Sequence, residues 1–422
     1  MDRLRVRAYN VRFGDAILVT VPDRGAAGTT VERHILIDVG NVLTGSGGQD
    51  EVFEPVIGDI LSVLDGKPLD LYVMTHEHMD HVQGLFWAKE KRGLDIEATH
   101  AWLTASAAPD YYERFPEAKK KKLAFLLAYR QIARYLRTAA STPSPVIEAL
   151  LLNNNPRKTS DCVEHLRTVG ETTTYVFNGA DISGAHPFEE ATFELWGPEE
   201  DTSTYYGSFL PMGLGLGPAE GDFESEIGTI ESAIASASEA AGATDAAGSA
   251  DEPDANDDAD EPPPDPLPPP GVDAGAFYRL VERRRRGVFD NLRRIDKAAN
   301  DSSVVFVLEW RGWRLLFPGD AEERAWKEMG KRDLLSAVHF LKIGHHGSHN
   351  GTPGGELLDR ILPPAPVDAR PRTALVSTHE GTYNNVPDVQ TLDELAERCA
   401  VSRIGESGDA LFTDLFFPDE VE

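Results

Sequence analysis

Alternating apolar and polar residues open the chain, and this period of two predicts β-strands. Leu4–Tyr9 alternates, Ala16–Val21 is an apolar run, and His34–Gly40 contains another. Gly14-Asp15 and the turn-forming residues of positions 22–30 separate these segments, as expected for strands that follow one another in a sheet.

Helical and strand patterns alternate in the next segment. Glu54–Leu64 and Glu117–Thr138 repeat apolar residues at helical spacing, and Leu69–Met74 is a short apolar run typical of a buried strand. That strand leads directly into a histidine-rich run at positions 75–81. Open α/β proteins place their chemistry at such strand ends.

The C-terminal part predicts a second β-rich half. Phe277–Ala298 predicts a helix, and two further helices are expected at Glu322–Met329 and Gly355–Ile361. The predicted strands are Val304–Leu308, Trp313–Phe317, Val338–Ile343 and Ala374–Ser377. We therefore expect a single α/β domain over residues 1–422, interrupted by one insertion.

The insertion covers about residues 213–270 and is rich in Ala, Ser, Gly, Asp, Glu and Pro. Such a composition cannot bury enough apolar surface to order itself, so we expect a disordered segment without a catalytic role. Fifteen acidic residues and no Lys or Arg lie between Glu220 and Asp265. Of the net charge of −29, the rest of the chain therefore carries −14.

Composition narrows the classes of protein further. No apolar stretch is long enough for a membrane span, and the N-terminus has no secretory pattern, so we expect a cytoplasmic protein that does not contact a membrane. The only cysteines, Cys162 and Cys399, cannot form a thiolate cage. Any metal ion must therefore be bound by His and carboxylate side chains.

Two runs of basic residues stand out in this acidic chain. Lys119–Lys122 and Arg283–Arg286 are each either the solvated face of a helix or a contact for phosphate groups. The arginine run (Arg283, Arg284, Arg285 and Arg286) is the better candidate for binding nucleic acid.

The run from His76 to His81 carries the strongest chemical signal. In an extended segment His76 and His78 point to the same side, while Asp80 and His81 follow as the chain turns into a helix. Imidazole and carboxylate groups are ligands for Zn²⁺ or Mn²⁺. Two further motifs, Gly319-Asp320 and His345-His346, end predicted strands of the second half.

This ordered set of motifs, together with Asp38 in the segment Leu36–Gly40, resembles the metallo-β-lactamase superfamily. The likeness is greatest to the hydrolase domain of ComEC-type DNA-uptake competence proteins and their free-standing relatives. The resemblance implies an αββα four-layer sandwich with two divalent metal ions, zinc or manganese, at one edge.

The resemblance also implies roles for individual residues. His76 and His78 would bind the first metal ion, Asp80, His81 and His345 the second, and Asp320 both. Asp38 would orient a ligand histidine. His346 would be a substrate-facing or supporting group, or the true ligand if the register shifts by one residue.

The chain departs from the superfamily pattern at two places. Asn300 stands where many members have a further histidine for the first metal, and either His165 or His186 could replace that histidine only after a loop rearrangement. His379 either faces the cleft or is an ordinary loop residue. Asn300 and His379 are accordingly candidates for supporting or substrate-facing groups.

The expected activity is hydrolysis by a metal-bound hydroxide without a covalent intermediate, with Asp80, Asp320 and His346 as catalytic candidates. A phosphodiesterase or nuclease acting on nucleic acid fits the resemblance and the arginine run. A small-molecule esterase or lactonase of the same fold is the alternative, and a catalytically weakened binding module is a third. Metal content discriminates the binding module from the enzymes.

Overall fold

The computed structural model describes residues 2–25, 28–42, 50–138, 144–207, 273–377, 386–404 and 410–419. The predicted insertion at 213–270 lies outside these residues. The chain divides into two compact units: the first comprises Met1–Lys121, Pro145–Ser208 and Leu292–Glu422, and the second comprises Lys122–Ser144 and Phe209–Asn291. The candidate metal ligands, Asp38 and Asn300 all lie in the first unit.

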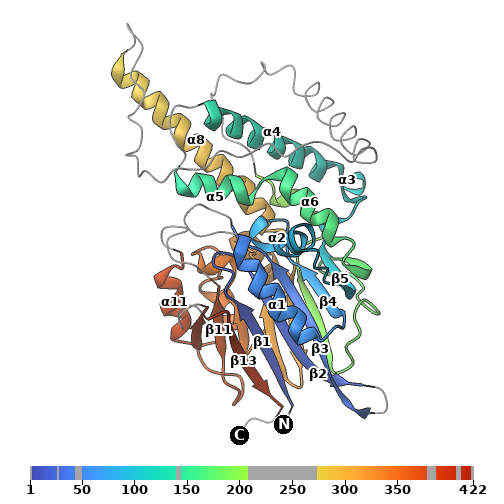
Figure 1. Cartoon of the computed structure of the whole chain (residues 1–422). Coiled ribbons are helices and arrows are strands. Elements are labelled where there is room, and N and C mark those ends of the chain that lie inside the picture. Colours follow the sequence, from blue (N-terminus) through green and yellow to red (C-terminus); the bar gives the residue numbers. More distant parts are fainter. Residues whose placement is uncertain are drawn as a thin grey trace. The chain divides into compact units, whose positions relative to one another are not determined.

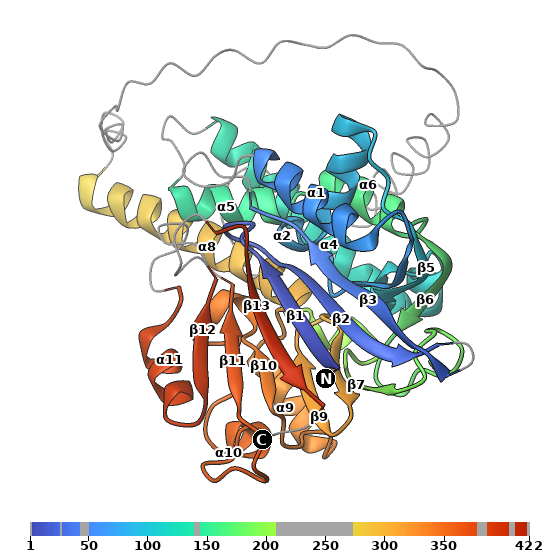
Figure 2. The ribbon, with the colours of Figure 1, turned by 60° about the horizontal axis from the view of Figure 1, so that its bottom comes forward.

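The first sheet in the described part of the chain has the strand order β13-β1-β2-β3-β4-β5-β6. Its pairs are antiparallel from β13 to β3 and parallel from β3 to β6. Figure 2 shows the last strand, β13, beside the first, β1. The strands are β1 (Arg3–Tyr9), β2 (Ala16–Arg24), β3 (Thr30–Val39), β4 (Leu69–Met74), β5 (Ala98–Thr104), β6 (Gly170–Val176) and β13 (Phe412–Pro418).

The second sheet has the order β12-β11-β10-β9-β8-β7 among the described strands. Strands β9 to β12 are parallel, and β7 and β8 complete the sheet in antiparallel pairs. The strands are β7 (Ala191–Gly197), β8 (Val305–Trp310), β9 (Trp313–Phe317), β10 (Phe340–Lys342), β11 (Thr373–Val376) and β12 (Ala400–Arg403).

The helices connect these strands, and two of them, α4 and α8, cross the boundary between the units. No helix within the described ranges is both long and apolar enough to cross a membrane. The α-helices are α1 (Phe53–Leu64), α2 (Met79–Trp87), α3 (Tyr111–Arg114), α4 (Pro116–Thr138), α5 (Pro145–Asn153), α6 (Pro156–Leu166), α8 (Ala274–Asn300), α9 (Glu323–Lys331), α10 (Glu356–Ile361) and α11 (Val389–Ala396).

Both sheets contribute to one buried apolar cluster. Alternate residues of β1 and β2, such as Val6 and Val19, join Phe306 of β8 and Leu315 of β9 in this cluster. Because strand side chains alternate between faces, one face of each sheet is buried there and the other is left for helices.

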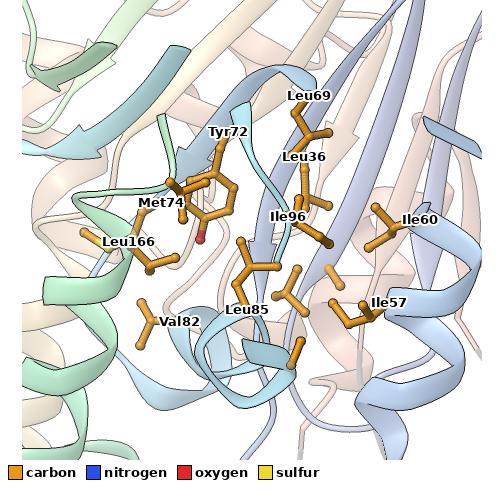
Figure 3. Packing of buried hydrophobic residues seen from close by; sticks show 14 of the residues in the cluster. Leu36, Ile57, Ile60, Leu69, Tyr72, Met74, Val82, Leu85, Ile96 and Leu166 are labelled. Carbon is orange, nitrogen blue, oxygen red and sulfur yellow. The ribbon is translucent and has the colours of Figure 1, made fainter. Parts of the chain in front are cut away.

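Helices cover the remaining faces. Residues of α1, α2 and α6 pack against the other side of the first sheet, and Figure 3 shows Ile57, Leu85 and Leu166 meeting Leu36 and Tyr72. Helix α1 lies along the strands of this sheet in Figure 1. Residues of α9, α10 and α11 form a corresponding cluster on the second sheet.

The expectation of a mixed α/β fold is confirmed, with two sheets and covering helices. The predicted strands β4 and β9 have the predicted bounds, and the predicted helix at Phe277–Ala298 extends to Ala274–Asn300. The helix predicted at Glu117–Thr138 begins one residue earlier, at Pro116.

Candidate metal centre

The candidate ligands lie at strand ends of both sheets. His76 and His78 follow β4, and Asp80 and His81 occupy the first turn of α2. Asp320 follows β9, two residues after Pro318. All five side chains are buried, with at most 2% of each residue exposed. Strand ends of two sheets therefore bring their polar groups to one place.

At Gly40, the backbone that follows β3 packs closely against the backbone of Asp80 and His81. A Cβ atom at Gly40 would lie 2.1 Å from the carbonyl carbon of Asp80 and 2.2 Å from the nitrogen of His81. Only glycine lets the end of β3 approach the first turn of α2 this closely.

Four buried side chains, Asp80, His81, Asp320 and His346, form the largest group of possible metal ligands among the described residues. One ligand atom from each lies within 4.8 Å of the others. Nε2 of His81 is 3.3 Å from Oδ2 of Asp320, and Nε2 of His346 is 3.3 Å from Oδ2 of Asp80. Two imidazoles and two carboxylates are a donor set that Zn²⁺ or Mn²⁺ accepts.

Polar atoms of this group that have no hydrogen-bond partner are suited to bind a metal ion. Oδ1 of Asp80, Nε2 of His81 and Nε2 of His346 are buried and have no hydrogen-bond partner among the described residues. Buried polar atoms are almost always hydrogen-bonded, because leaving one unpaired costs about 1–3 kcal/mol. A divalent cation would satisfy all three, so the residues present fit a metal ion.

A second group adjoins the first through Asp80. His76, His78 and Asp80 place ligand atoms within 4.8 Å of one another, and Nε2 of His76 lies 3.0 Å from Nδ1 of His78. Each of the two groups offers ligand atoms that could hold a metal ion.

The other ring nitrogen of each inward-facing histidine is hydrogen-bonded to the protein. Nδ1 of His76 contacts Oγ1 of Thr75 at 3.1 Å, and Nε2 of His78 contacts Oδ1 of Asn154 at 2.9 Å. Because Thr75 Oγ1 itself donates to Asp38, the proton of the first contact belongs to His76. These bonds leave Nε2 of His76 and Nδ1 of His78 to face an ion.

The rings of His81 and His346 are held in the same way. Nδ1 of His81 lies 2.8 Å from Oδ2 of Asp38, and Nδ1 of His346 lies 3.1 Å from the carbonyl oxygen of Ser377. Asp38 also accepts from the backbone nitrogen of Thr75 at 2.8 Å. Asp38 therefore contacts both the ring of His81 and the residue that precedes His76.

In this group, burial and the neighbouring opposite charges shift each pKa in opposite directions. Burial disfavours the charged form of His81, but the carboxylates of Asp320, Asp80 and Asp38 outweigh burial and raise its pKa well above the usual value. Burial also disfavours ionised Asp320, yet His81 and His346 hold its pKa well below the usual value. In the metal-free protein, protons on the histidines thus balance the carboxylates, and a bound cation would replace them.

The two adjacent histidines take different positions. His346 joins the group of Asp80, His81 and Asp320, whereas His345 joins a separate group with Asp296 and Glu322. Both have left-handed backbone, with φ of 47° at His345 and 53° at His346. The sequence assigned His345 to the second ion with His346 as the alternative, and the structure groups His346 with Asp80, His81 and Asp320.

The remaining candidates lie elsewhere. Asn300 is buried near His345, with Nδ2 3.4 Å from Nε2. The ring of His165 packs on Phe86, that of His186 packs on Trp102 and Phe193, and neither joins a metal-ligating group of the described residues. His379 and the side chains of Arg283–Arg286 lie outside the described residues, although the backbone of the four arginines is helical.

Several contacting residues were not singled out from the sequence. Asn153 accepts from the backbone nitrogen of Asp80 at 3.1 Å, and Asn154 bonds His78. Lys342 donates to Asp15 at 2.7 Å, and Ser377 Oγ donates to the same carboxylate. The run Asn153-Asn154-Asn155 and the lysine within an apolar strand were the signals available.

Comparisons with known proteins add little. No protein-family model and no curated protein matches the chain. Among solved structures it has a similarity to a long-form RNase Z from yeast, with 17% sequence identity and a TM-score of 0.14. The match covers 24% of this chain and 14% of the RNase Z chain. A similarity this small decides neither the fold nor the activity.

Proposed function

We propose that this chain is a metal-dependent hydrolase with the metallo-β-lactamase fold and a dinuclear centre of zinc or manganese. The apolar cluster shared by the two sheets, with helices packed on each outer face, supports the αββα four-layer arrangement. The observation that carries the proposal is the set of three buried, unpartnered atoms of Asp80, His81 and His346.

In this proposal His76 and His78 hold the first ion, and Asp80, His81 and His346 hold the second. Asp320 is proposed to serve both ions, and Asp80 is the residue that belongs to both groups of possible ligands. His346 replaces His345 of the sequence assignment, because its Nε2 is the atom that faces Asp80 and Asp320.

When bound, the divalent ions would supply Lewis acidity and lower the pKa of water toward neutrality. Asp80 and Asp320 provide carboxylate oxygens that can hold a proton during the reaction. The ring of Phe13 packs on His346 with a centroid separation of 4.2 Å and limits the movement of that ring. No serine or cysteine nucleophile is required.

The proposed substrate is a phosphodiester, in nucleic acid or a related molecule. The motifs shared with ComEC-type domains and the arginine run Arg283–Arg286 support this choice. Assays of metal-loaded protein on single-stranded DNA, duplex DNA, RNA, bis-p-nitrophenyl phosphate and a lactone test it directly. If only the lactone is hydrolysed, the protein is a small-molecule esterase or lactonase and not a phosphodiesterase.

Three variants test the metal centre itself. Asp320→Ala removes the carboxylate that would serve both ions and is expected to reduce bound metal and turnover to background. His346→Ala is expected to lose the second ion and at least 100-fold of the rate, while His345→Ala retains both ions of the dinuclear centre. Metal analysis and hydrolysis rates of the purified variants provide the measurement.

The outcomes of these variants are separable. If His345→Ala loses the second ion and His346→Ala keeps it, the ligand assignment returns to His345. If Asp320→Ala keeps both ions and the full rate, the dinuclear hydrolase is excluded.

A further inference from the structure

A third group of metal-ligating side chains lies outside the six proposed ligands. Asp296 comes from the last turns of α8, Glu322 precedes α9, and His345 follows β10. One ligand atom from each lies within 4.8 Å of the others. Glu322 is buried, and the side chains of Asp296 and His345 are only 12% and 22% exposed.

The amide of Asn300 lies among these three side chains. Its Nδ2 is 2.9 Å from Oε1 of Glu322, 3.5 Å from Oδ2 of Asp296 and 3.4 Å from Nε2 of His345. An acceptor atom from each residue of the group therefore converges on a single point. Such convergence is what a cation needs, and here a neutral amide provides only two protons for three acceptors.

Two unpartnered atoms mark the same place. Asn300 is fully buried, yet its Oδ1 has no hydrogen-bond partner among the described residues, and Nδ1 of His345 has none either. The nearest carboxylate oxygen to that Nδ1 is Oε1 of Glu322, at 3.5 Å. Turning the Asn300 amide by 180° would aim Oδ1 at the acceptors, which is favourable only if a cation lies between them.

Charge at this group is incompletely balanced. Lys297 contacts Oε2 of Glu322 at 3.1 Å, and Asn350 donates to the same oxygen. Oε1 of Glu322 and Oδ2 of Asp296 face Asn300 instead. The charge of Lys297 therefore offsets only part of the charge of the two buried carboxylates. Because burying unbalanced charge is costly, a bound cation is favoured here.

We propose that Asp296, Glu322, His345 and Oδ1 of Asn300 form a third divalent-cation site, separate from the dinuclear centre. Two carboxylates, an amide oxygen and one imidazole favour Mn²⁺ over a thiolate-preferring ion. The site joins the end of α8 to the segments before α9 and after β10. It shares no ligand with the dinuclear centre, although Oδ1 of Asp296 lies 3.6 Å from Nε2 of His78, so Glu322→Gln is the variant that changes this site alone.

Titration of metal-free protein with Mn²⁺ tests the site, with bound ions counted from the EPR signal of free Mn²⁺. The parent protein is expected to bind three ions per chain. Glu322→Gln and Asp296→Asn, which keep the side-chain shape, are expected to bind two, or to bind the third at least 10-fold more weakly. The control Glu323→Gln removes the neighbouring exposed carboxylate, which pairs with Lys327, and keeps all three ions.

Asn300→Asp tests the same site by a gain of affinity, because it adds a charged oxygen where the amide lies. Its thermal midpoint is expected to rise with Mn²⁺ more than that of the parent. Circular dichroism confirms that each variant is folded, and either Glu322→Gln or Asp296→Asn suffices if the other is not. If both isosteric variants bind as many ions as the parent, with the same affinities, the proposal is overturned, whatever the number of ions in the dinuclear centre.

Discussion

At the scale of single residues, the hydrogen bonds behind the histidines matter as much as the ligands. Asp38 accepts from the backbone and hydroxyl of Thr75 and lies 2.8 Å from Nδ1 of His81. Its backbone is left-handed, with φ of 52°. Such a conformation is uncommon outside glycine and persists only where surrounding contacts fix it.

Asp38→Asn tests this role. The amide keeps the size of the carboxyl group but removes the charge that favours a proton on Nδ1 of His81, so metal affinity and rate are expected to fall 10- to 100-fold. Asp70→Asn is the matched control, because Asp70 also accepts from a backbone nitrogen, that of His34, but lies away from the candidate ligands. Metal titrations of both variants provide the measurement, and equal losses would show a general effect on the sheet.

The sequence predicted which residues gather at the candidate site better than it predicted the choice between neighbours. His76, His78, Asp80, His81 and Asp320 follow strands, and strand ends bring them together. His345 and His346 both lie in a left-handed segment where neither the strand nor the helix period holds. Their directions depend on loop geometry, which a linear pattern does not contain.

At the scale of elements, a buried ion pair joins both sheets beside the candidate centre. Lys342 of β10 donates to Asp15, which precedes β2, at 2.7 Å, and their side chains are 2% and 4% exposed. Ser377, which follows β11, donates to the same carboxylate and accepts from His346 through its carbonyl. The nitrogen of Asp15 bonds the carbonyl of Asp80 at 3.0 Å.

Lys342→Met is expected to destabilise the protein by about 3–5 kcal/mol, because it leaves the carboxylate of Asp15 buried without its partner. Asp15→Asn combined with Lys342→Met removes both charges and is expected to recover part of the loss. Denaturant unfolding of the two variants and the parent gives the free energies. A double variant less stable than Lys342→Met would show that the pair is not the source of the stability.

Some elements could not be predicted from local pattern. Strand β6 reads Gly-Glu-Thr-Thr-Thr-Tyr-Val and is only partly buried at the edge of its sheet, so its apolar alternation is weak. Strand β13 pairs with β1 from the opposite end of the chain. Such a pairing depends on long-range contacts, which override local propensity.

The arginine run of α8 is tested by changing Arg283–Arg286 to Ser. If these residues contact phosphate, cleavage of an oligonucleotide is expected to weaken and its dependence on salt to become less steep, because fewer counterions are released. Turnover of bis-p-nitrophenyl phosphate, which has a single phosphodiester group and no neighbouring phosphates, serves as the control. If the dependence of oligonucleotide cleavage on salt concentration does not change, the arginine run is the solvated face of a helix.

At the scale of the whole molecule, charge is distributed very unevenly along the chain. The segment 231–265 contains eleven acidic residues and no Lys or Arg. Its composition cannot form a packed core, so we expect it to act on a substrate only through its charge. Replacing residues 231–265 with a short Gly/Ser linker is therefore expected to change turnover of bis-p-nitrophenyl phosphate by less than about twofold.

The same replacement should have a different effect on a polyanionic substrate. At low ionic strength, removal of the acidic residues reduces repulsion of phosphates, and oligonucleotide cleavage is expected to become faster. At 1 M salt the Debye length shortens to about 3 Å and the difference should disappear. A control linker has the length of the Gly/Ser linker but contains the eleven acidic residues. It shortens the chain and keeps the charge, so it separates the effect of charge from that of chain length. Loss of turnover on the small substrate, in a protein that remains folded, would place the segment in the site instead.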